Sequence, residues 1–555
     1  MRSSVSCLTL ALLGFAASAA AQAPDRILVN GKIVTVDDRF TVREALAISG
    51  ERIVAVGNTA DIEKLKGGST QRIDLGGRTV IPGLIDNHAH YMRAGEYWDR
   101  EARLDGVTSH REALEVLRRK AAESKPGEWV LVLGGWSEEQ FTDEPRGFTK
   151  AELDAVAPNN PVVLQLIYFR IYANSAALKA LGVDAQTADP QGGKIDKQNG
   201  EPTGVLNGPG AVRMTLAKLG EVDQVRMREN ARAMMSDLNR MGITAYQEMG
   251  GRGFSPAHFS AFQGLAGTPH MTVRVFYNHW DDPSTPAEVD RAIARIRELK
   301  PFQGTDWFDL TGYGETVFFP LHDNLLQARA NPSPEGLQQL RRVMQALADR
   351  GVHLNVHAQL RASIEAFLDQ IEAVNGDKPI KGLRWTFSHA DQLEPRDIER
   401  MKRLGMYAQI HSRPTIQGIL MQKVHGERSY DMPPLRMIQD SGLPWGLGSD
   451  ATAVTPANPF YTLGWAVTGE MIGGRKVLRQ TITREEALIA HTRANAYFLF
   501  QEGNLGSLAA GKYADLLVLD RDYLTVPEGE IKDIRPVMTM VGGRIVHDGG
   551  QLRRD

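Results

Sequence analysis

The strongest constraint on the fold is a series of eight apolar segments, each ending in polar residues that can do chemistry. Helical segments with one apolar face separate most of them, and the clearest are 334–350, 362–374, 395–404 and 431–441. Alternating strands and helices predict a parallel sheet, and eight such units can close into a barrel. We therefore predict a (β/α)8 barrel of the TIM type, with strands at 79–90, 242–250, 271–278, 307–315, 352–357, 383–389, 406–411 and 443–450.

The two ends of the chain differ from its middle. Short alternating strands and turns occur at 26–75 and again at 514–547, and neither set has enough apolar residues to bury a sheet alone. We predict one small β-sandwich domain built from residues 24–78 and 503–555, with the barrel at 79–502 between them. Residues 91–218 do not fit the eight units, so we expect an insertion after the first strand, where active-site lids occur.

The first 21 residues have the pattern of a secretory signal peptide. A positive charge at Arg2 precedes an apolar run at 5–17 that is too short to span a bilayer. We expect cleavage after Ala21, with Ala23 as the alternative, and a periplasmic or secreted protein without a membrane span. Cleavage would remove Cys7, the one cysteine of the chain, and with it any thiol nucleophile.

The charge balance excludes one class of partner. The chain has 64 Lys and Arg against 67 Asp and Glu, a formal net charge of −3. It therefore lacks the basic field that attracts a phosphate backbone, and we expect no nucleic-acid partner.

Four histidines and one aspartate lie at the carboxyl ends of the predicted barrel strands. His88 and His90 end the first strand, and residues i and i+2 of a strand point to the same side, so both imidazoles can face one point. His357 ends the fifth strand, His389 the sixth and Asp450 the eighth. Because barrel strands present their carboxyl ends to one face, these side chains should converge. Imidazoles with a carboxylate suit zinc or a similar divalent metal.

Several segments resemble the amidohydrolase superfamily. They are Ile81-Pro82-Gly83-Leu84-Ile85-Asp86 before His88-Ala89-His90, then Ser388-His389, Gly448-Ser449-Asp450 and the stretch at 506–515. The long insertion, with Gly134-Gly135-Trp136 and Asn174-Ser175-Ala176-Ala177-Leu178, resembles the amidohydrolase 3 branch of that superfamily.

The resemblance implies a metal-dependent hydrolase that cleaves a carbon–nitrogen bond other than a peptide bond by attack of a metal-activated water. It implies that His88, His90, His357 and His389 bind metal, and that Asp450 is a metal-side carboxylate and proton shuttle. Asp450 and His389 are thus the expected catalytic residues. The implied cofactor is one or two divalent metal ions, and we expect zinc. The implied partner is a small-molecule amide substrate. A homodimer is one option for the assembly.

The chain departs from the family pattern at the end of the fourth strand. Many relatives have a lysine or a glutamate there that bridges two metals, and this strand contains no lysine. Glu315 is our candidate bridge, and the alternative is that it is a carboxylate at the rim. Glu248, at the end of the second strand, is the second choice. If neither bridges, the site holds one metal.

Four residues are candidates for substrate binding. His411 and Arg413 end the seventh strand on the active face, where an arginine could bind a carboxylate through two hydrogen bonds. Arg170 lies about where the branch often has glycine and histidine, so the usual substrate contacts have changed. Trp136 could form part of an aromatic wall, although aromatic residues are more often core.

Two alternatives to amide hydrolysis remain. The same metal site would serve a deaminase or a cyclic-amide hydrolase. A different class is a non-catalytic secreted barrel that binds or regulates, because one fold hosts many functions. A decayed enzyme should have lost a metal-site residue, and none of the five expected ones is missing.

Overall fold

The computed structural model describes residues 23–251 and 254–555. The predicted signal peptide at 1–21 lies outside the described residues. Within the described ranges, no helix has both the length and the apolar composition needed to cross a membrane.

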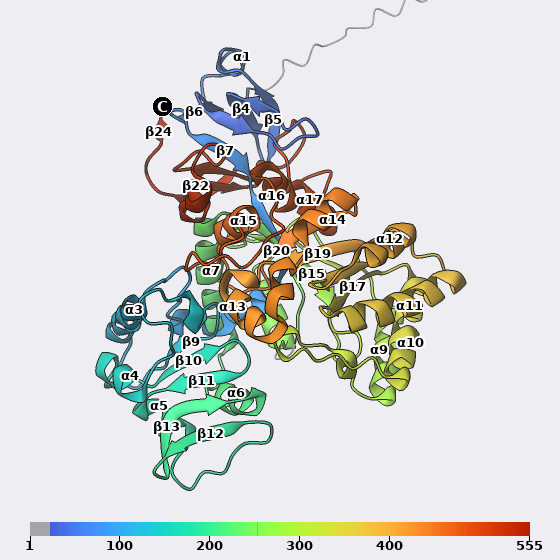
Figure 1. The fold of residues 1–555 in the computed structure, drawn as a ribbon. Coiled ribbons are helices and arrows are strands. Elements are labelled where there is room, and N and C mark those ends of the chain that lie inside the picture. Colours follow the sequence, from blue (N-terminus) through green and yellow to red (C-terminus); the bar gives the residue numbers. More distant parts are fainter. Residues whose placement is uncertain (1–22, 252–253) are drawn as a thin grey trace, which may run out of the picture.

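An eight-stranded parallel sheet forms the centre of the molecule (Figure 1), which confirms the predicted barrel. Its seam is bridged by two backbone hydrogen bonds of 2.9 Å, from the N–H of Asp450 to the carbonyl of His88 and from the N–H of His90 to that of Ala451. In spatial order the strands are β8 (Leu84–Ala89), β14 (Ile243–Glu248), β15 (Arg274–His279), β16 (Phe308–Tyr313), β17 (His353–Ala358), β18 (Thr386–His389), β19 (Tyr407–His411) and β20 (Trp445–Gly448).

Helices with one apolar face cover the outside of the barrel. Helix α10 (Pro334–Arg350) and helix α12 (Pro395–Leu404) have the predicted bounds. Each begins with proline and ends at a glycine with a left-handed backbone, Gly351 and Gly405, the usual signals for both ends. The other helices that follow barrel strands are α8 (Pro256–Gln263), α9 (Pro286–Glu298), α11 (Arg361–Asp377), α13 (Pro414–His425), α14 (Leu435–Ser441), α15 (Pro459–Thr468), α16 (Arg484–Ala490) and α17 (Arg493–Phe498).

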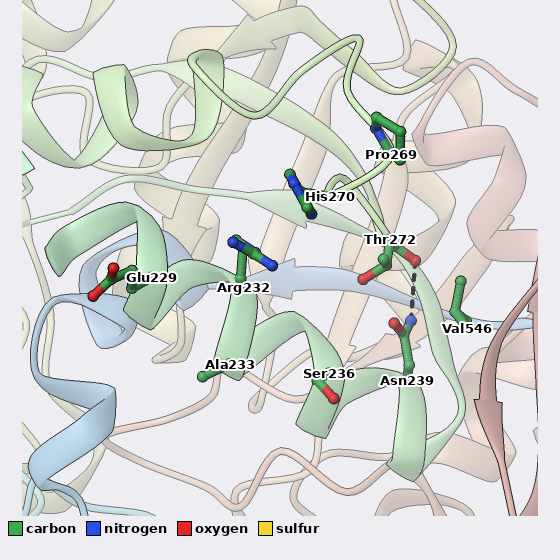
Figure 2. A pocket seen from close by; sticks show the side chains of 9 residues that line it. All are labelled: Glu229, Arg232, Ala233, Ser236, Asn239, Pro269, His270, Thr272 and Val546. Atoms are coloured by element: carbon green, nitrogen blue, oxygen red, sulfur yellow. Dashed lines mark hydrogen bonds between the residues drawn. The ribbon is translucent and has the colours of Figure 1, made fainter. Parts of the chain in front are cut away.

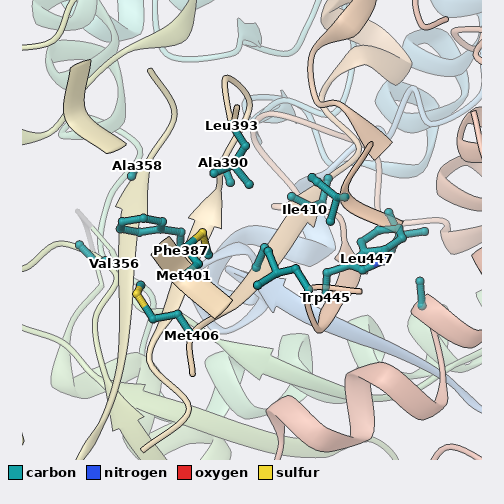
Figure 3. Packing of buried hydrophobic residues seen from close by; sticks show 14 of the residues in the cluster. Val356, Ala358, Phe387, Ala390, Leu393, Met401, Met406, Ile410, Trp445 and Leu447 are labelled. Carbon is teal, nitrogen blue, oxygen red and sulfur yellow. The ribbon is translucent and has the colours of Figure 1, made fainter. Parts of the chain in front are cut away.

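Alternation along the strands separates an apolar outer face from a polar interior. Val356, Phe387 and Ile410 lie in one apolar cluster with Met401 of helix α12 (Figure 3). Successive side chains of a strand point to opposite faces, so the residues between them face the barrel interior. These inward residues are polar, and they include Asn355, His357, Ser388, Gln409 and His411.

Both ends of the chain form the expected β-domain (Figure 1). One sheet has the order β24 (Arg553–Arg554), β6 (Gln71–Asp74), β1 (Arg26–Val29), β4 (Ala45–Ser49) and β5 (Arg52–Gly57). The other has the order β23 (Arg544–Asp548), β22 (Pro536–Val541), β21 (Leu516–Leu519), β7 (Thr79–Pro82), β2 (Lys32–Val34) and β3 (Val42–Arg43).

The segment predicted as the first barrel strand is in fact two strands. Strand β7 pairs with β2 and β21 of the β-domain, and only β8 joins the barrel. The break falls at Gly83, where a Cβ atom would overlap the side chain of Thr244. The chain passes from one domain to the other at this point, and an apolar run alone does not reveal such a crossing.

The residues between β8 and helix α7 (Gln224–Met241) contain a separate sheet. Its order is β12 (Lys194–Gln198), β13 (Glu201–Asn207), β11 (Arg170–Ala173), β10 (Val162–Leu166) and β9 (Val130–Val132). With it are the helices α2 (Tyr91–Ala94), α3 (His110–Glu123), α4 (Lys150–Val156), α5 (Ser175–Leu181) and α6 (Pro209–Leu216). The Ser137 hydroxyl donates to the carbonyl of Ile416 at 2.5 Å, and a Cβ atom on Gly134 would overlap the backbone of Ala453. The insertion therefore contacts the start of helix α13, after β19, and the loop after β20, on the face where the barrel strands end.

Candidate metal centre

Five histidines and two carboxylates meet at the carboxyl ends of the barrel strands, and all seven are buried. They form three groups whose ligand atoms lie within 4.8 Å of one another: His88, His90 and Asp450; Glu315, His357 and His389; and His88, His389 and His411. The structure thus brings together all six residues that were predicted to bind metal, and it adds His411 to them.

Glu315 lies between the two halves of this cluster. Its Oε2 atom is 3.1 Å from Nε2 of His389 and 3.4 Å from Nδ1 of His357. The same oxygen is 3.5 Å from Nε2 of His88, and Oε1 is 3.8 Å from Nε2 of His90. Burial would raise the pKa of Glu315, but the surrounding histidines hold it well below its usual value. This ionised carboxylate lies within 4 Å of histidines from both pairs, so it is placed to bind a metal together with either pair.

Glu248, the second choice for a bridge, is held elsewhere. Its carboxylate accepts the backbone N–H of Met92 at 2.8 Å and that of Gly250 at 3.0 Å. Its approach to Nδ1 of His90 is 4.0 Å. Because its oxygens are held by the backbone of helix α2 and of the loop after β14, Glu248 is less available to a metal than Glu315.

Asp450 uses its two oxygens differently. Oδ1 lies 3.1 Å from Nε2 of His90 and 3.7 Å from Nε2 of His88. Oδ2 accepts hydrogen bonds from Nε of Arg413 at 3.1 Å and from its Nη2 at 2.5 Å. Burial would raise the pKa of Asp450, but Arg413 and the histidines hold it well below its usual value. The carboxylate therefore stays ionised, with one oxygen directed at the histidines.

This pairing corrects the role predicted for Arg413. A substrate carboxylate was the expected partner of its guanidinium, and the structure gives that place to Asp450. The donors of an arginine are arranged to hold a carboxylate, whether it belongs to a substrate or to the protein. Strand-end position alone cannot distinguish the two.

His411 was predicted as a substrate contact, and the structure places its ring among the metal-binding candidates. The ring centroid is 4.1 Å from that of His88 and 4.3 Å from that of His389. Its Nδ1 atom is 2.5 Å from Nδ1 of His389. The signal for this position was in the sequence, because His411 ends a barrel strand just as His389 does.

The other two predicted substrate residues belong to the insertion. Trp136 is fully buried, packs against Phe141, and donates from Nε1 to the carbonyl of Gln165 at 2.9 Å. It is a core residue, not a wall of the substrate site. Arg170 pairs with Glu138 at 3.0 Å and donates to the side chain of Asn207 at 2.8 Å. Its guanidinium is thus held within the sheet of the insertion.

Two residues behind His357 were missed by sequence reasoning. Oδ1 of Asp323 lies 2.9 Å from Nε2 of His357, and the ring of His322 stacks on the His357 ring at 3.8 Å. Burial lowers the pKa of His357, but Asp323 and Glu315 outweigh burial and raise it to about 10. Asp323 lies in the loop after β16, and no repeating pattern shows which loop residues turn inward.

The backbone is also unusual at two site residues. His389 has a φ of 75° and Asp450 a φ of 67°, in the left-handed region. Residues other than glycine lose about 1–3 kcal/mol there, and such conformations cluster at functional sites, where the surroundings hold them in place. At Asp450 the surroundings include the backbone hydrogen bond to His88 across the barrel seam.

Two buried nitrogen atoms show that the cluster fits a metal ion. Among the described residues, Nε2 of His88 and Nε2 of His411 have no hydrogen-bond partner. An unsatisfied buried polar atom costs about 1–3 kcal/mol. Burial lowers the pKa of His88 to about 4, so its ring is neutral and can offer a lone pair. Neutral imidazoles beside ionised carboxylates are the donors that divalent transition metals prefer.

A cavity of about 460 Å³ lies elsewhere, between helix α7, the loop before β15 and β23 (Figure 2). Arg232, His270 and Asn239 are among its lining residues, and no residue of the metal cluster lines it. Barrel enzymes carry their catalytic groups at the carboxyl ends of the strands. The donor chemistry at those ends therefore decides the site, not the size of this cavity.

Comparison with known proteins agrees with this chemistry. Residues 71–547 match the model of the Amidohydrolase family. N-substituted formamide deformylase from Arthrobacter pascens is 28% identical over 94% of this chain and 98% of that protein. A putative amidohydrolase of Bacillus subtilis is 26% identical over 94% of this chain and 98% of its own. The crystal structure of an uncharacterized metal-dependent hydrolase from Pyrococcus horikoshii has a TM-score of 0.65 at 20% identity, over 91% of this chain and 99% of that one.

Proposed function

The chain belongs to the amidohydrolase family and is a metal-dependent hydrolase of carbon–nitrogen bonds, and from this premise we propose that it cleaves a small-molecule N-acyl or N-formyl amide. The observation that carries the proposal is that the two carboxylate oxygens of Asp450 have different partners. One of its oxygens faces the histidine cluster, and the other is held by Arg413. The similarity to a formamide deformylase over nearly the whole chain supports an acyclic amide as substrate.

We assign the metal to two of the three groups of ligand atoms described above. We assign His88, His90 and Asp450 to one zinc ion and His357 and His389 to a second, with Glu315 between them. When bound, zinc would lower the pKa of a water molecule and polarise the carbonyl group of the amide.

Asp450 carries the proton in this proposal. Its low pKa keeps it ionised before the reaction, so Oδ1 can accept a proton from the attacking water and deliver it to the leaving nitrogen. Because Arg413 holds Oδ2, the carboxylate cannot turn away from the cluster.

The test is a hydrolysis screen with purified, zinc-loaded protein. N-substituted formamides, other N-acyl amides, cyclic amides and amino-substituted heterocycles are compared under the same conditions. We expect the first two classes to release a carboxylic acid and an amine in equal amounts. Release of ammonia from the heterocycles alone would show a deaminase, and opening of the cyclic amides alone would show a cyclic-amide hydrolase. Either result overturns the proposal.

A further inference from the structure

A layer of polar side chains crosses the barrel interior beside the metal centre. Barrel interiors are usually filled by bulky apolar residues, and a buried polar layer destabilises the fold unless its hydrogen bonds are made. The layer has one side chain from each of the six strands β14 to β19, each at most 5% exposed: Gln247, Asn278, Thr311, Asn355, Ser388 and Gln409.

Most of these side chains form a chain of hydrogen bonds that runs in one direction. Nε2 of Gln409 donates to Oε1 of Gln247 at 2.8 Å, and Nε2 of Gln247 donates to Oδ1 of Asn278 at 3.3 Å. Nδ2 of Asn355 donates to Oε1 of Gln409, and the hydroxyl of Ser388 donates to Oδ1 of Asn355. Each amide thus donates on one side and accepts on the other.

Met249 sets that direction. Its Sδ atom lies 3.2 Å from Nδ2 of Asn278. A thioether sulfur can accept a hydrogen bond but cannot donate one, so Asn278 must turn its NH2 group to Met249 and its oxygen to Gln247. Reversing any later amide would set two NH2 groups or two carbonyl oxygens against each other.

This chain of hydrogen bonds ends at His88. Oγ of Ser388 lies 3.3 Å from Nδ1 of His88. Ser388 has one hydroxyl proton, which faces Oδ1 of Asn355, and Oε1 of Gln409 at 3.3 Å is the other acceptor within its reach. Its oxygen can therefore only accept a hydrogen bond from His88, which requires the imidazole proton to be on Nδ1.

We propose that this polar chain fixes His88 in the tautomer with its proton on Nδ1 and its lone pair on Nε2. Nε2 is the atom that faces Glu315 at 3.5 Å and, within the described residues, lacks a hydrogen-bond partner. A chain running the other way would let Ser388 donate to Nδ1, which would place the proton on Nε2 and block a metal ion. Ser388 is thus a positioning residue, and a neighbouring hydrogen bond of this kind orients a ligand histidine. The inference rests on the proposed metal centre.

Nitrogen-15 NMR of the metal-free protein, labelled at histidine, tests the tautomer without any metal. The signals of His88 are assigned by their loss in His88→Gln. We expect the form protonated at Nδ1 in the wild type. A majority protonated at Nε2 would overturn the proposal, even if the metal centre is real. If the protein shows the Nδ1 form but binds no zinc, the result would contradict the proposed metal centre and still agree with the proposed chain of hydrogen bonds.

Variants of Ser388 test the consequence for metal binding. Ser388→Ala removes the acceptor for Nδ1, and we expect zinc affinity to fall about 10- to 100-fold. Ser388→Thr keeps the hydroxyl and should restore most of the affinity. Met249→Leu removes the anchor, so we expect a mixture of His88 tautomers and a smaller loss. Thr311→Val, which touches the chain only at its side, is the matched control. Unchanged zinc affinity and an unchanged His88 spectrum in folded Ser388→Ala would rule the proposal out.

Discussion

Buried charges occur at both ends of the barrel, and the two sets are paired differently. At the amino end of β15, the fully buried Arg274 makes two hydrogen bonds to Asp515 of the β-domain, at 2.8 and 3.1 Å. Its Nη1 donates to the carbonyl of Asp306 at 3.0 Å, and Asp515 also accepts the N–H of Gly542 at 2.7 Å. At the carboxyl end, Nε2 of His88 and Nε2 of His411 have no hydrogen-bond partner among the described residues.

The difference separates a structural ion pair from a binding site. A buried charge without a partner is strongly destabilising, so a purely structural pair must be saturated, as Arg274 and Asp515 are. Convergent donors left unsaturated in an equally buried place indicate that something else completes them. Saturation of hydrogen bonds therefore distinguishes the Arg274–Asp515 pair from the histidine cluster better than burial or charge does.

Asp450→Asn changes the carboxyl end of the barrel, and its effect on turnover is the largest that we expect. An amide cannot accept the proton, so we expect turnover of the best amide substrate to fall roughly 100- to 10,000-fold. The fold should persist because the amide oxygen can still accept from Arg413. Steady-state kinetics and circular dichroism measure the two. Turnover within tenfold of the wild type would remove Asp450 from the mechanism.

Arg274→Met removes the buried ion pair at the amino end of the barrel. It should lower the stability of the fold and leave catalysis unchanged. Removing one partner of a buried pair leaves Asp515 uncompensated, so we expect a loss of about 3–5 kcal/mol in the free energy of unfolding. Urea unfolding measures the loss, and turnover per folded molecule should be unchanged. The matched control is Arg274→Met combined with Asp515→Leu, which should recover much of the stability. A single variant as stable as the wild type would mean that the two ends do not differ as stated.

Removal of the metal is expected to have the smallest effect of the three changes, and it acts on the carboxyl end of the barrel. A ligand that binds only the folded state adds stability, about 2.7 kcal/mol when its free concentration is 100 times its Kd. We expect a chelator to lower the thermal midpoint and zinc to restore it. Because the two ends are far apart, the losses from chelation and from Arg274→Met should add. Chelation without any change in the midpoint would contradict a metal at the unsaturated end.

Much of the fold could be predicted because its signals are local. The bounds of α10 and α12 follow from apolar periodicity and from proline and glycine at their ends. The division between β7 and β8 at Gly83 was not predictable, since both strands are fully buried and the apolar run continues from Val80 to Ile85 without a polar break. The sheet inside the insertion was also missed as a unit, because its strands are short and pair across long loops.

The amino-acid sequence by itself determined which residues stand at the ends of the barrel strands. Alternation and apolar run length are properties of neighbouring residues, so they suffice to place His88, His357 and His389 at those ends. Only the tertiary structure decided how distant side chains pair, as Arg413 does with Asp450 and Met249 with the polar chain. Hydrogen-bond partners are chosen by distance and direction in space, and separation along the chain carries almost no information about either.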